Sequence, residues 1–435
     1  MTRSSPGSHD DNILAAASSL HGGQNASLLT ALDALAHHRN APMVDWLRTH
    51  LFEHVLPFWE NHAIDDHGGL LTCLSDTGRI RSTDKWLWSQ WRAVWVFSRI
   101  HNTLQPDQRW LRLARHIADF CVAHGWDNQH DGWALVLSRE GKILRGHESV
   151  YVDAFAVYGL VELFRADRDD RWLKLACRTA DAALRKLDLP TDRIPHFPYP
   201  IPAGTQPHGL PMIWSLKMAE LAEVSRKDEY ARAARTFSNA IFERFLSDQG
   251  LIAEYIRGDG RHLPSPLGTV VVPGHALECL WFQIHIQRLL GDGSQRTEQI
   301  LALVLRHLEA GWDQTCHGGL SLAIDMRGSE FVPAWNHASA KLWWPHTEAL
   351  YAALLGWQAS QDRRFLQWYE RLWCFCADHY VDRTHGEWRQ KLDRRLQPLD
   401  DIVALPVKDP FHLPRSLILQ IEALLPASPS KRLSI

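Results

Sequence analysis

Apolar residues recur at helical spacing from Met43 almost to the end of the chain. In the stretches 46–56, 110–118, 155–164 and 350–355, apolar side chains lie three or four positions apart, as they do on the buried face of a helix. Long stretches in which apolar and polar residues alternate, the pattern of a half-buried β-strand, do not occur. The pattern therefore predicts a mainly α-helical protein.

A short motif of a polar residue, glycine and an apolar residue returns between the helical stretches. It reads HGGLL at 67–71, DGWAL at 131–135, QGLI at 249–252, HGGLS at 317–321 and HGEW at 385–388, with a degenerate copy that lacks glycine at 192–195. The copies follow one another at roughly 60–70 residues, a period that indicates one repeated supersecondary unit. We interpret the unit as an outer helix, an inner helix and a short β-hairpin in the loop between helices. Six such units closed into a ring predict an all-α fold, the (α/α)6 barrel.

The repeat indicates a single domain. We expect a flexible N-terminal leader at 1–40, where the chain is polar and irregular, one barrel at 41–425 and a C-terminal tail at 426–435. The hydrophobic content of 45% is ample for a sizeable core, so the barrel is expected to be well ordered.

Composition and charge exclude several classes of partner. The net charge is −3, and no run of basic residues suits nucleic acid or an anionic membrane. No stretch of about 18 apolar residues is present to span a bilayer, and the N-terminus lacks the apolar core of a signal peptide. The seven cysteines are scattered without a CxxC motif, a pattern typical of reduced thiols. We therefore expect a cytoplasmic protein with no nucleic-acid and no membrane partner.

Twenty tryptophans are the outstanding feature of the composition. Part of this count must lie in the core, but flat aromatic faces also stack on the C–H faces of sugar rings. A carbohydrate is therefore the first small-molecule ligand to consider.

Basic and aromatic residues share one stripe of a predicted helix at 85–95. Trp88, Arg92 and Trp95 follow Lys85 at i+3, i+7 and i+10. A guanidinium inside a barrel can hold a carbonyl or hydroxyl oxygen by two hydrogen bonds. A buried structural arginine paired with an acid would explain the same pattern.

A candidate acid–base pair follows a helix start at Pro273–Gly274. The break before an apolar run places His275 in the first turn of a helix. Glu278 lies three residues on and on the same face, where its carboxylate would orient the imidazole and raise its basicity. The pair could also be a structural contact or half of a metal site. Against a metal site, the sequence shows no third metal ligand nearby.

Two further segments combine a helix start with polar and aromatic residues. In 341–348 two adjacent tryptophans precede a proline, and Trp344 shares a face with Glu348, so that one indole is a candidate platform for a sugar. In 408–415 two prolines stiffen the chain around His412, which we place at the entrance of the last helix. A lone histidine there is commonly structural, but this one has the same place in its repeat as the histidine of the second segment.

The four segments together resemble the N-acylglucosamine 2-epimerase family. The likeness extends from about residue 45 to 420 and rests on KxxWxQxRxxW at 85–95, PGHALE at 273–278, KLWWPHTEA at 341–349 and HGEW…KxPFHLPR at 385–415. Four such motifs, in order and on a matching repeat, are highly specific. The resemblance implies an (α/α)6 barrel, in agreement with the repeat, and a sugar isomerase that needs no metal and no cofactor.

The resemblance also implies roles for individual residues. His275 and His412 are expected to be the paired acid–base catalysts. Glu278 is expected to orient His275, and Arg92 to hold the substrate oxygens near C1 and C2. Further contacts with the sugar are expected from Trp88, Tyr151, Met212, Trp344, Glu348 and Lys408. A homodimer is the usual assembly in the family.

Members of this family differ in substrate. They include epimerases of N-acetylglucosamine and N-acetylmannosamine, cellobiose 2-epimerases, and isomerases of mannose or sulfoquinovose. Ile213 stands where the cellobiose and isomerase branches have a histidine, and Val407 where the cellobiose branch has a tryptophan. These departures favour inversion at C2 of an N-acylhexosamine through an enediolate of the ring-opened sugar. The alternative is an aldose–ketose isomerase or a 2-epimerase of mannose-type or other unmodified sugars.

A glycoside hydrolase or lyase of the same fold is a different class that would use two carboxylates across the glycosidic bond. Glu278, Glu348, Asp153 and Glu387 are the candidates. Two histidines with rigid flanks fit an epimerase better, and they would serve no purpose in a non-catalytic sugar-binding barrel.

Overall fold

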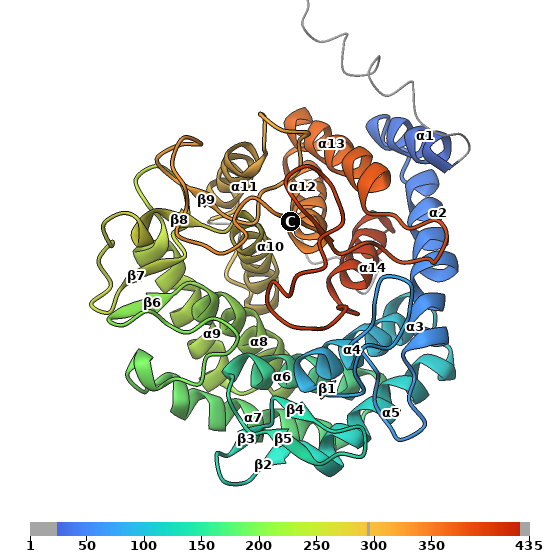
Figure 1. Ribbon diagram of the computed structural model, residues 1–435, viewed down its shortest axis with the longest axis vertical. Helices are drawn as coiled ribbons and strands as arrows, with labels where there is room; N and C mark the ends of the chain where they lie inside the picture. Colours follow the sequence, from blue (N-terminus) through green and yellow to red (C-terminus); the bar gives the residue numbers. More distant parts are fainter. Residues whose placement is uncertain (1–23, 294–295, 427–435) are drawn as a thin grey trace, which may run out of the picture.

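Two concentric layers of helices form an (α/α)6 barrel in the computed structural model, which describes residues 24–293 and 296–426 (Figure 1). The inner helices are α4 (Leu87–Arg99), α6 (Val150–Asp167), α8 (Gly209–Ser225), α10 (Pro273–Leu290), α12 (Trp343–Ser360) and α14 (His412–Leu424). The outer helices are α2 (Ala41–Thr49), α3 (Leu56–His62), α5 (Gln108–His124), α7 (Asp170–Leu187), α9 (Asp228–Ala240), α11 (Thr297–Gly311) and α13 (Arg363–His379). Neighbouring inner helices pack against each other, and α14 closes the ring onto α4. The predicted fold is confirmed.

The two layers differ in how they bury their side chains. α12 is buried along most of its length, because the outer helices cover one side and the other inner helices cover the rest. α7 buries one stripe only, with Trp172, Ala176, Ala180 and Ala183 on it, and exposes charged residues on the opposite face. Continuous apolar runs in the sequence thus mark inner helices, and clear 3.6-residue periodicity marks outer ones.

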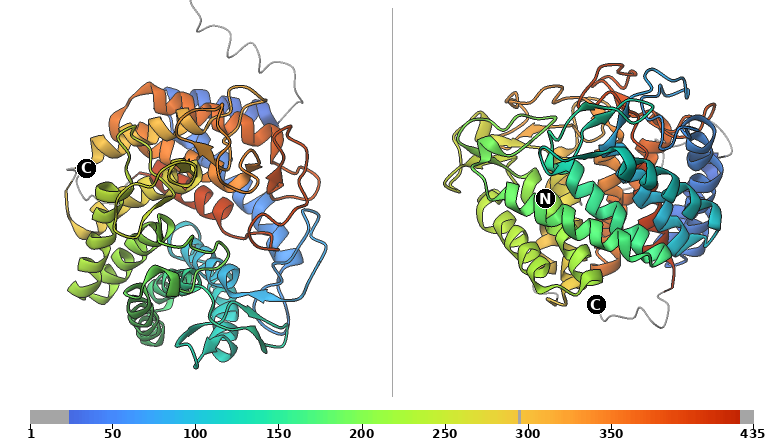
Figure 2. Two further views of the ribbon diagram at one scale, coloured as in Figure 1. Left: turned by 60° about the vertical axis from the view of Figure 1, so that its left-hand side comes forward. Right: turned by 90° about the horizontal axis from the view of Figure 1, so that it is seen from below.

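Short antiparallel strand pairs and hairpins gather at one end of the barrel, above the helix layers in the right-hand view of Figure 2. A three-stranded sheet consists of β1 (Lys85–Trp86), β4 (Val136–Leu137) and β5 (Ile143–Arg145). The two-stranded pairs are β2 (Trp126–Asp127) with β3 (Gly132–Trp133), β6 (Thr205–Pro207) with β7 (Tyr255–Arg257), β8 (Val270–Val271) with β9 (Ile324–Asp325), and β10 (Lys341–Leu342) with β11 (Lys391–Leu392). Short π-helical turns lie at His50–Val55, Ile100–Leu104 and Ile241–Phe245, and 3-10 turns at Thr191–Arg193 and Leu267–Thr269.

In several copies of the glycine motif, a helix side chain binds a backbone N–H of the turn. In the first copy the backbone N–H of Leu70 donates to Gln90 Oε1 at 2.7 Å, and in the fifth the N–H of Leu320 donates to His346 Nε2 at 2.8 Å. Gly69 has a φ of +70°, and a Cβ there would lie 2.8 Å from Gln90 Oε1. Glycine is therefore required at position 69, where the side chain of Gln90 binds the turn. The degenerate copy is replaced by the 3-10 turn at Thr191–Arg193.

Tryptophan fills much of the space between the layers. Ten of the twenty tryptophans are among the largest fully buried side chains: Trp59, Trp91, Trp95, Trp110, Trp133, Trp172, Trp214, Trp281, Trp373 and Trp388. Packing therefore accounts for half of the count, and a smaller group of tryptophans lines the cavity described below.

The N-terminal part of the chain differs from the prediction. Helix α1 (Gln24–Ala36) lies within the segment expected to be a flexible leader. Leu28, Leu32 and Leu35 form an apolar stripe that is buried, and α1 packs against α2 and α13. Residues 1–23 and 427–435, which contain the rest of the predicted leader and nearly all of the predicted tail, lie outside the described residues.

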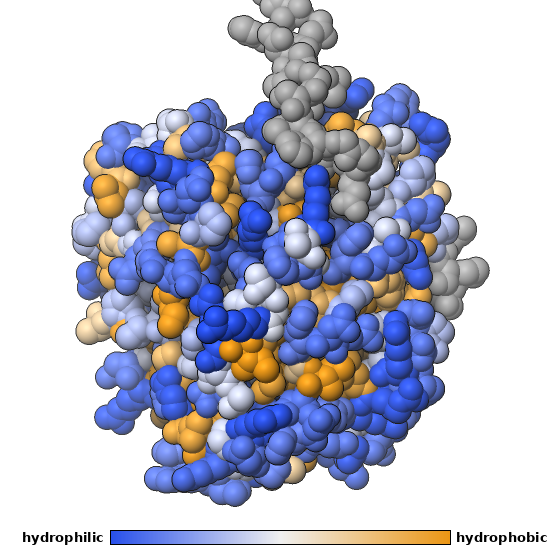
Figure 3. Space-filling model, turned by 45° about the vertical axis from the view of Figure 1, so that its right-hand side comes forward, coloured by the Kyte–Doolittle hydropathy of each residue, from blue (hydrophilic) through white to orange (hydrophobic). Residues whose placement is uncertain are grey.

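The surface carries no broad apolar band on the face drawn in Figure 3, where apolar residues form separate groups among hydrophilic ones. Within 24–293 and 296–426, no helix combines the length and apolar character needed to cross a membrane.

Candidate active site

A cavity of about 170 Å³ lies at the hairpin end of the barrel, among the first turns of the inner helices. The chain between β11 and α14 crosses this end of the barrel (Figure 1). It adds Val403, Ala404, Leu405, Val407 and Asp409 to the lining. Aromatic side chains, imidazoles, carboxylates and a guanidinium meet in the cavity. The predicted residues that line it are Trp88, Arg92, Tyr151, Met212, His275, Glu278, Trp344 and His412.

His275 lies in the first turn of α10, as predicted, because Pro273 starts the helix after the extended residue Val272. Its Nδ1 lies 3.1 Å from Oε2 of Glu254, and this contact leaves Nε2 as the nitrogen available to a molecule in the cavity. Burial disfavours the protonated ring, but the negative charge of Glu254 outweighs burial and raises the pKa of His275 above its ordinary value of 6.5.

The predicted partner of His275 is wrong. Glu278 shares a face of α10 with His275, but its Oε1 lies 2.5 Å from Nη2 of Arg415, and the carboxylate on the imidazole is that of Glu254. Glu254 directly precedes β7 and reaches the ring from outside the helix, whereas Glu278 lies one turn deeper in α10. Spacing along one helix was therefore insufficient to identify the pair.

His412 is the first residue of α14, also as predicted. Its backbone N–H donates to Asp409 Oδ2 at 3.0 Å, and its Nδ1 lies 2.8 Å from Oε1 of Glu348. Because a carboxylate accepts hydrogen bonds, Nδ1 carries the proton of the neutral ring and Nε2 is free to accept one. Burial, and next the positive charge of Arg92, lower the pKa of His412 to about 3. The two imidazoles therefore differ in proton affinity, since the surroundings raise the pKa of His275 and lower that of His412.

Trp344 contacts both histidines. Its ring centroid lies 5.1 Å from that of His275 and 5.6 Å from that of His412. The indole thus contacts both imidazoles and forms part of the cavity wall. This position agrees with the predicted aromatic platform.

Arg92 reaches the cavity from α4. Its Nη1 donates to Asp409 Oδ1 at 2.9 Å, and its guanidinium carbon lies 4.0 Å from the ring centroid of Phe155. The Nε–H of Arg92 has no hydrogen-bond partner among the described residues. Arg92 also lines the cavity, so its guanidinium can bind an oxygen atom there.

Three side chains near the cavity floor have the donor types of a metal site. Glu278, Glu348 and His412 place one ligand atom each within 4.8 Å of the others. Arg415 Nη2 already lies between the two carboxylates, 2.5 Å from Glu278 Oε1 and 2.7 Å from Glu348 Oε1. The arrangement is an ion-paired cluster around a guanidinium, which supplies the positive charge that a metal ion would bring.

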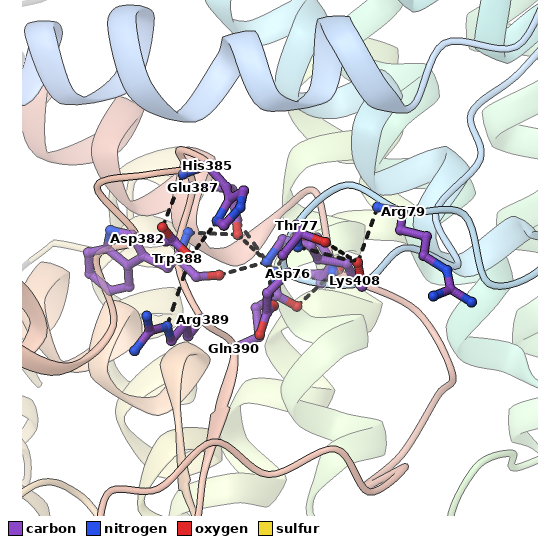
Figure 4. A network of polar contacts seen from close by, with 12 residues as sticks. Asp76, Thr77, Arg79, Asp382, His385, Glu387, Trp388, Arg389, Gln390 and Lys408 are labelled. Carbon is purple, nitrogen blue, oxygen red and sulfur yellow. Dashed lines mark hydrogen bonds and ion pairs between the residues drawn. The ribbon is translucent and has the colours of Figure 1, made fainter.

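Two predicted sugar contacts lie elsewhere. Glu348 does not line the cavity but lies beneath His412. There it also accepts a hydrogen bond from Trp281 Nε1 at 2.9 Å. Lys408 is also not among the lining residues. Its Nζ lies 2.7 Å from Glu387 Oε2 and 2.8 Å from Asp76 Oδ1 (Figure 4).

Lys408 thereby joins three distant parts of the chain. Asp76 belongs to the turn between the bridged residues Leu74 and Ile80, and Glu387 to the last copy of the glycine motif. The residue after Lys408 is Asp409, which binds both Arg92 and the first N–H of α14. The ion pairs of Lys408 therefore hold the chain that carries Asp409 and His412 against the barrel.

Sequence reasoning missed three residues that the fold brings to the site: Glu254, Asp409 and Arg415. Glu254 follows the glycine motif at 249–252 by two residues, and Asp409 and Arg415 lie in the segment 408–415 around His412. A search for acids just after each motif would have found Glu254. The contacts of Arg415 depend on α10 and α12 and have no signal in the local sequence.

The fold and this site define a class, the barrel enzymes that isomerise sugars, and comparison with known proteins agrees. The family model described as N-acylglucosamine 2-epimerase matches residues 69–413. The chain therefore belongs to the N-acylglucosamine 2-epimerase family and is an isomerase.

Individual relatives support this assignment. The N-acylglucosamine 2-epimerase of Rattus norvegicus is 27% identical over 380 residues, which cover 83% of this chain and 87% of the relative. That of Homo sapiens is 28% identical over 378 residues, with coverage of 86% and 88%. Among solved structures, cellobiose 2-epimerase from Bacillus thermoamylovorans B4167 has a TM-score of 0.76 at 18% identity and covers 87% of this chain and 99% of that one. The structural likeness confirms the barrel.

Proposed function

We propose that the protein inverts C2 of an N-acylhexosamine, interconverting N-acyl-D-glucosamine and N-acyl-D-mannosamine. The observation that carries the proposal is the pair of imidazoles, His275 and His412, which line one cavity, contact the same indole and are each held at Nδ1 by a carboxylate. Their surroundings push their pKa values in opposite directions, as a base and an acid that act together require.

The chemistry begins with a ring-opened sugar, because the hydrogen on C2 is acidic only when C1 is a carbonyl. Neutral His412 accepts this proton at Nε2, and the electron pair of the C2–H bond moves to form the enediolate. The guanidinium of Arg92 binds the negative oxygen that develops at C1. Protonated His275 then donates its proton to C2 from the opposite face, which restores the carbonyl with inverted configuration. In the reverse direction the two histidines exchange roles.

The N-acyl substituent is supported by the relatives and by the lining. Ile213 and Val407 line the cavity, at positions where other branches of the family were expected to carry a histidine and a tryptophan. Met212 and Leu405 add to the apolar part of the wall. An acyl methyl group gains from contact with such a surface, whereas a second sugar unit presents hydroxyl groups that it leaves unpaired.

The carboxylates that a glycoside hydrolase would need are otherwise engaged. Glu278 and Glu348 share Arg415, and Glu387 is paired with Lys408. Asp153 lies 2.7 Å from His147 Nε2 and is fully buried. These contacts favour the epimerase over the hydrolase or lyase.

Deuterium incorporation tests the proposal. The protein is incubated in D2O with N-acetylmannosamine, mannose or cellobiose, and C2 is followed by NMR. We expect deuterium at C2 together with the C2 epimer, and fastest for N-acetylmannosamine. Appearance of a ketose instead identifies an aldose–ketose isomerase, and cleavage of an oligosaccharide without exchange contradicts both activities.

Glu254→Gln tests the role of the carboxylate on His275. The substitution keeps the shape but removes the negative charge that raises the pKa of His275, so this pKa falls. When His412 is the base, protonated His275 donates the proton to C2. Activity is therefore lost as pH rises through the pKa of His275. We therefore expect the basic limb of the kcat/KM profile for N-acetylmannosamine to move to lower pH in the variant. A basic limb at the wild-type pH would contradict the assignment.

A further inference from the structure

Lys217 is a buried lysine that the proposed chemistry does not use. It lies further along α8 than Met212 and Ile213, and its side chain is completely buried. Its Nζ has no hydrogen-bond partner in the part of the chain that the structure describes, and it lies 3.8 Å from the ring centroid of Tyr158. Burying an ammonium group without a hydrogen-bonded counter-charge opposes folding. Stability alone therefore does not explain this residue.

Cations and phenyl groups alternate around Lys217, beneath the cavity. Each of three cations lies near two phenyl rings, and each ring near two cations, at distances of 4.0 to 5.9 Å from charged group to ring centroid. In order around the circle, the members are Arg92, Phe155, Lys217, Phe282, Arg415 and Phe411. We call this arrangement the cation–phenyl ring. It draws on five of the six inner helices, since Phe411 directly precedes α14.

Lys217 balances the charge of this region. Of the other two cations, Arg92 forms an ion pair with Asp409. Arg415 forms ion pairs with both Glu278 and Glu348. Without Lys217, two positive charges would therefore face three carboxylates directly beneath the cavity. With Lys217, three positive charges face three carboxylates.

The surroundings of Lys217 contain charges of both signs. Burial, and next the charge of Arg415, lower the pKa of Lys217 to about 7. The charged and titratable groups that face it are Arg92 of α4, Tyr158 of α6, Glu220 of its own helix, Glu278 and His285 of α10, and Arg415 of α14. Its charge is therefore fully present in mildly acidic solution and declines above neutral pH.

We propose that Lys217 is a positioning residue that completes the cation–phenyl ring, so that His412 stays neutral. Without the ammonium, the surplus negative charge favours a proton on His412. Protonation of His412 removes active enzyme on the acidic side of the pH profile. The proposal rests on the epimerase function, in which His412 acts as a base.

The test compares Lys217→Met with Lys217→Arg, which keeps the charge. For Lys217→Met we expect the acidic limb of the kcat/KM profile for N-acetylmannosamine to move up by about one pH unit. Lys217→Arg should keep the wild-type limb. A Lys217→Met profile that coincides with the wild-type one, or a loss of activity that is uniform across pH, overturns the proposal.

Thermal unfolding supplies a readout that does not depend on the reaction. Because the pKa of Lys217 is lower in the folded protein than its ordinary 10.5, its burial destabilises the fold most below pH 7 and progressively less above it. Lys217→Met should therefore melt higher than the wild type at pH 6, with a gain that shrinks towards pH 9. A lower melting temperature, or a gain independent of pH, contradicts the proposal. If wild-type protein turns over none of the sugars, the proposed function fails, and this measurement still decides whether the buried charge is unpaired.

Discussion

Replacing His412 with alanine is expected to lower kcat for epimerisation of N-acetylmannosamine by about 10²–10⁴-fold, the usual contribution of one acid–base group. The same loss is expected for His275→Ala. The physical reason is that inversion requires proton transfer on both faces of a planar enediolate, and each imidazole serves one face. Rates are measured by NMR and unfolding by calorimetry.

Isotope exchange makes this prediction sharper. With one base left, each variant should still exchange the C2 hydrogen of one epimer with D2O while forming none of the other, and the two variants should prefer opposite epimers. His346→Ala is the matched control, because His346 is buried and binds the backbone N–H of Leu320 away from the cavity. It should lower the melting temperature and leave kcat nearly unchanged. Equal epimerisation by all three variants would exclude the two-histidine mechanism.

Arg92→Met should have the second largest effect, a fall in kcat/KM of about 10²–10³-fold. The variant keeps the length of the side chain but removes the charge that stabilises the enediolate oxygen. Arg92→Lys should recover little of this loss, since an ammonium cannot bind Asp409 and a substrate oxygen with the geometry of a guanidinium.

Arg99 is the control for Arg92. It lies at the other end of α4, where it is paired with Glu422 and Glu162 and takes no part in the cavity. Arg99→Met should therefore reduce thermal stability while the enzyme that remains folded keeps its kcat. A loss of kcat in Arg99→Met as large as in Arg92→Met would show that the effect is structural.

Much of the fold was predictable from local features of the sequence. Helical periodicity and the recurring glycine motif are short-range properties, because a turn or a helix face depends on residues a few positions apart. The same holds for His275 and His412. Each lies at a helix start because a proline, Pro273 or Pro410, stands two residues before it. Helix α1 was missed because a short apolar stripe becomes a stable helix only when α2 and α13 cover it.

The partners of the catalytic candidates could not be predicted in this way. Glu278 is adjacent to His275 on the helix, yet closure of the barrel gives Glu254 to His275 and Arg415 to Glu278. Lys408, expected at the sugar, instead binds Asp76 from the opposite end of the chain. These contacts join residues that are 21, 137 and 332 positions apart in the chain.

The sequence by itself determined the barrel, its repeats and the two histidines that face the cavity. Only the tertiary structure decided which carboxylate holds each imidazole and where the buried charges balance. The physical reason is that helices and turns form from local preferences, whereas burial and electrostatic pairing depend on which inner helices meet when the ring closes.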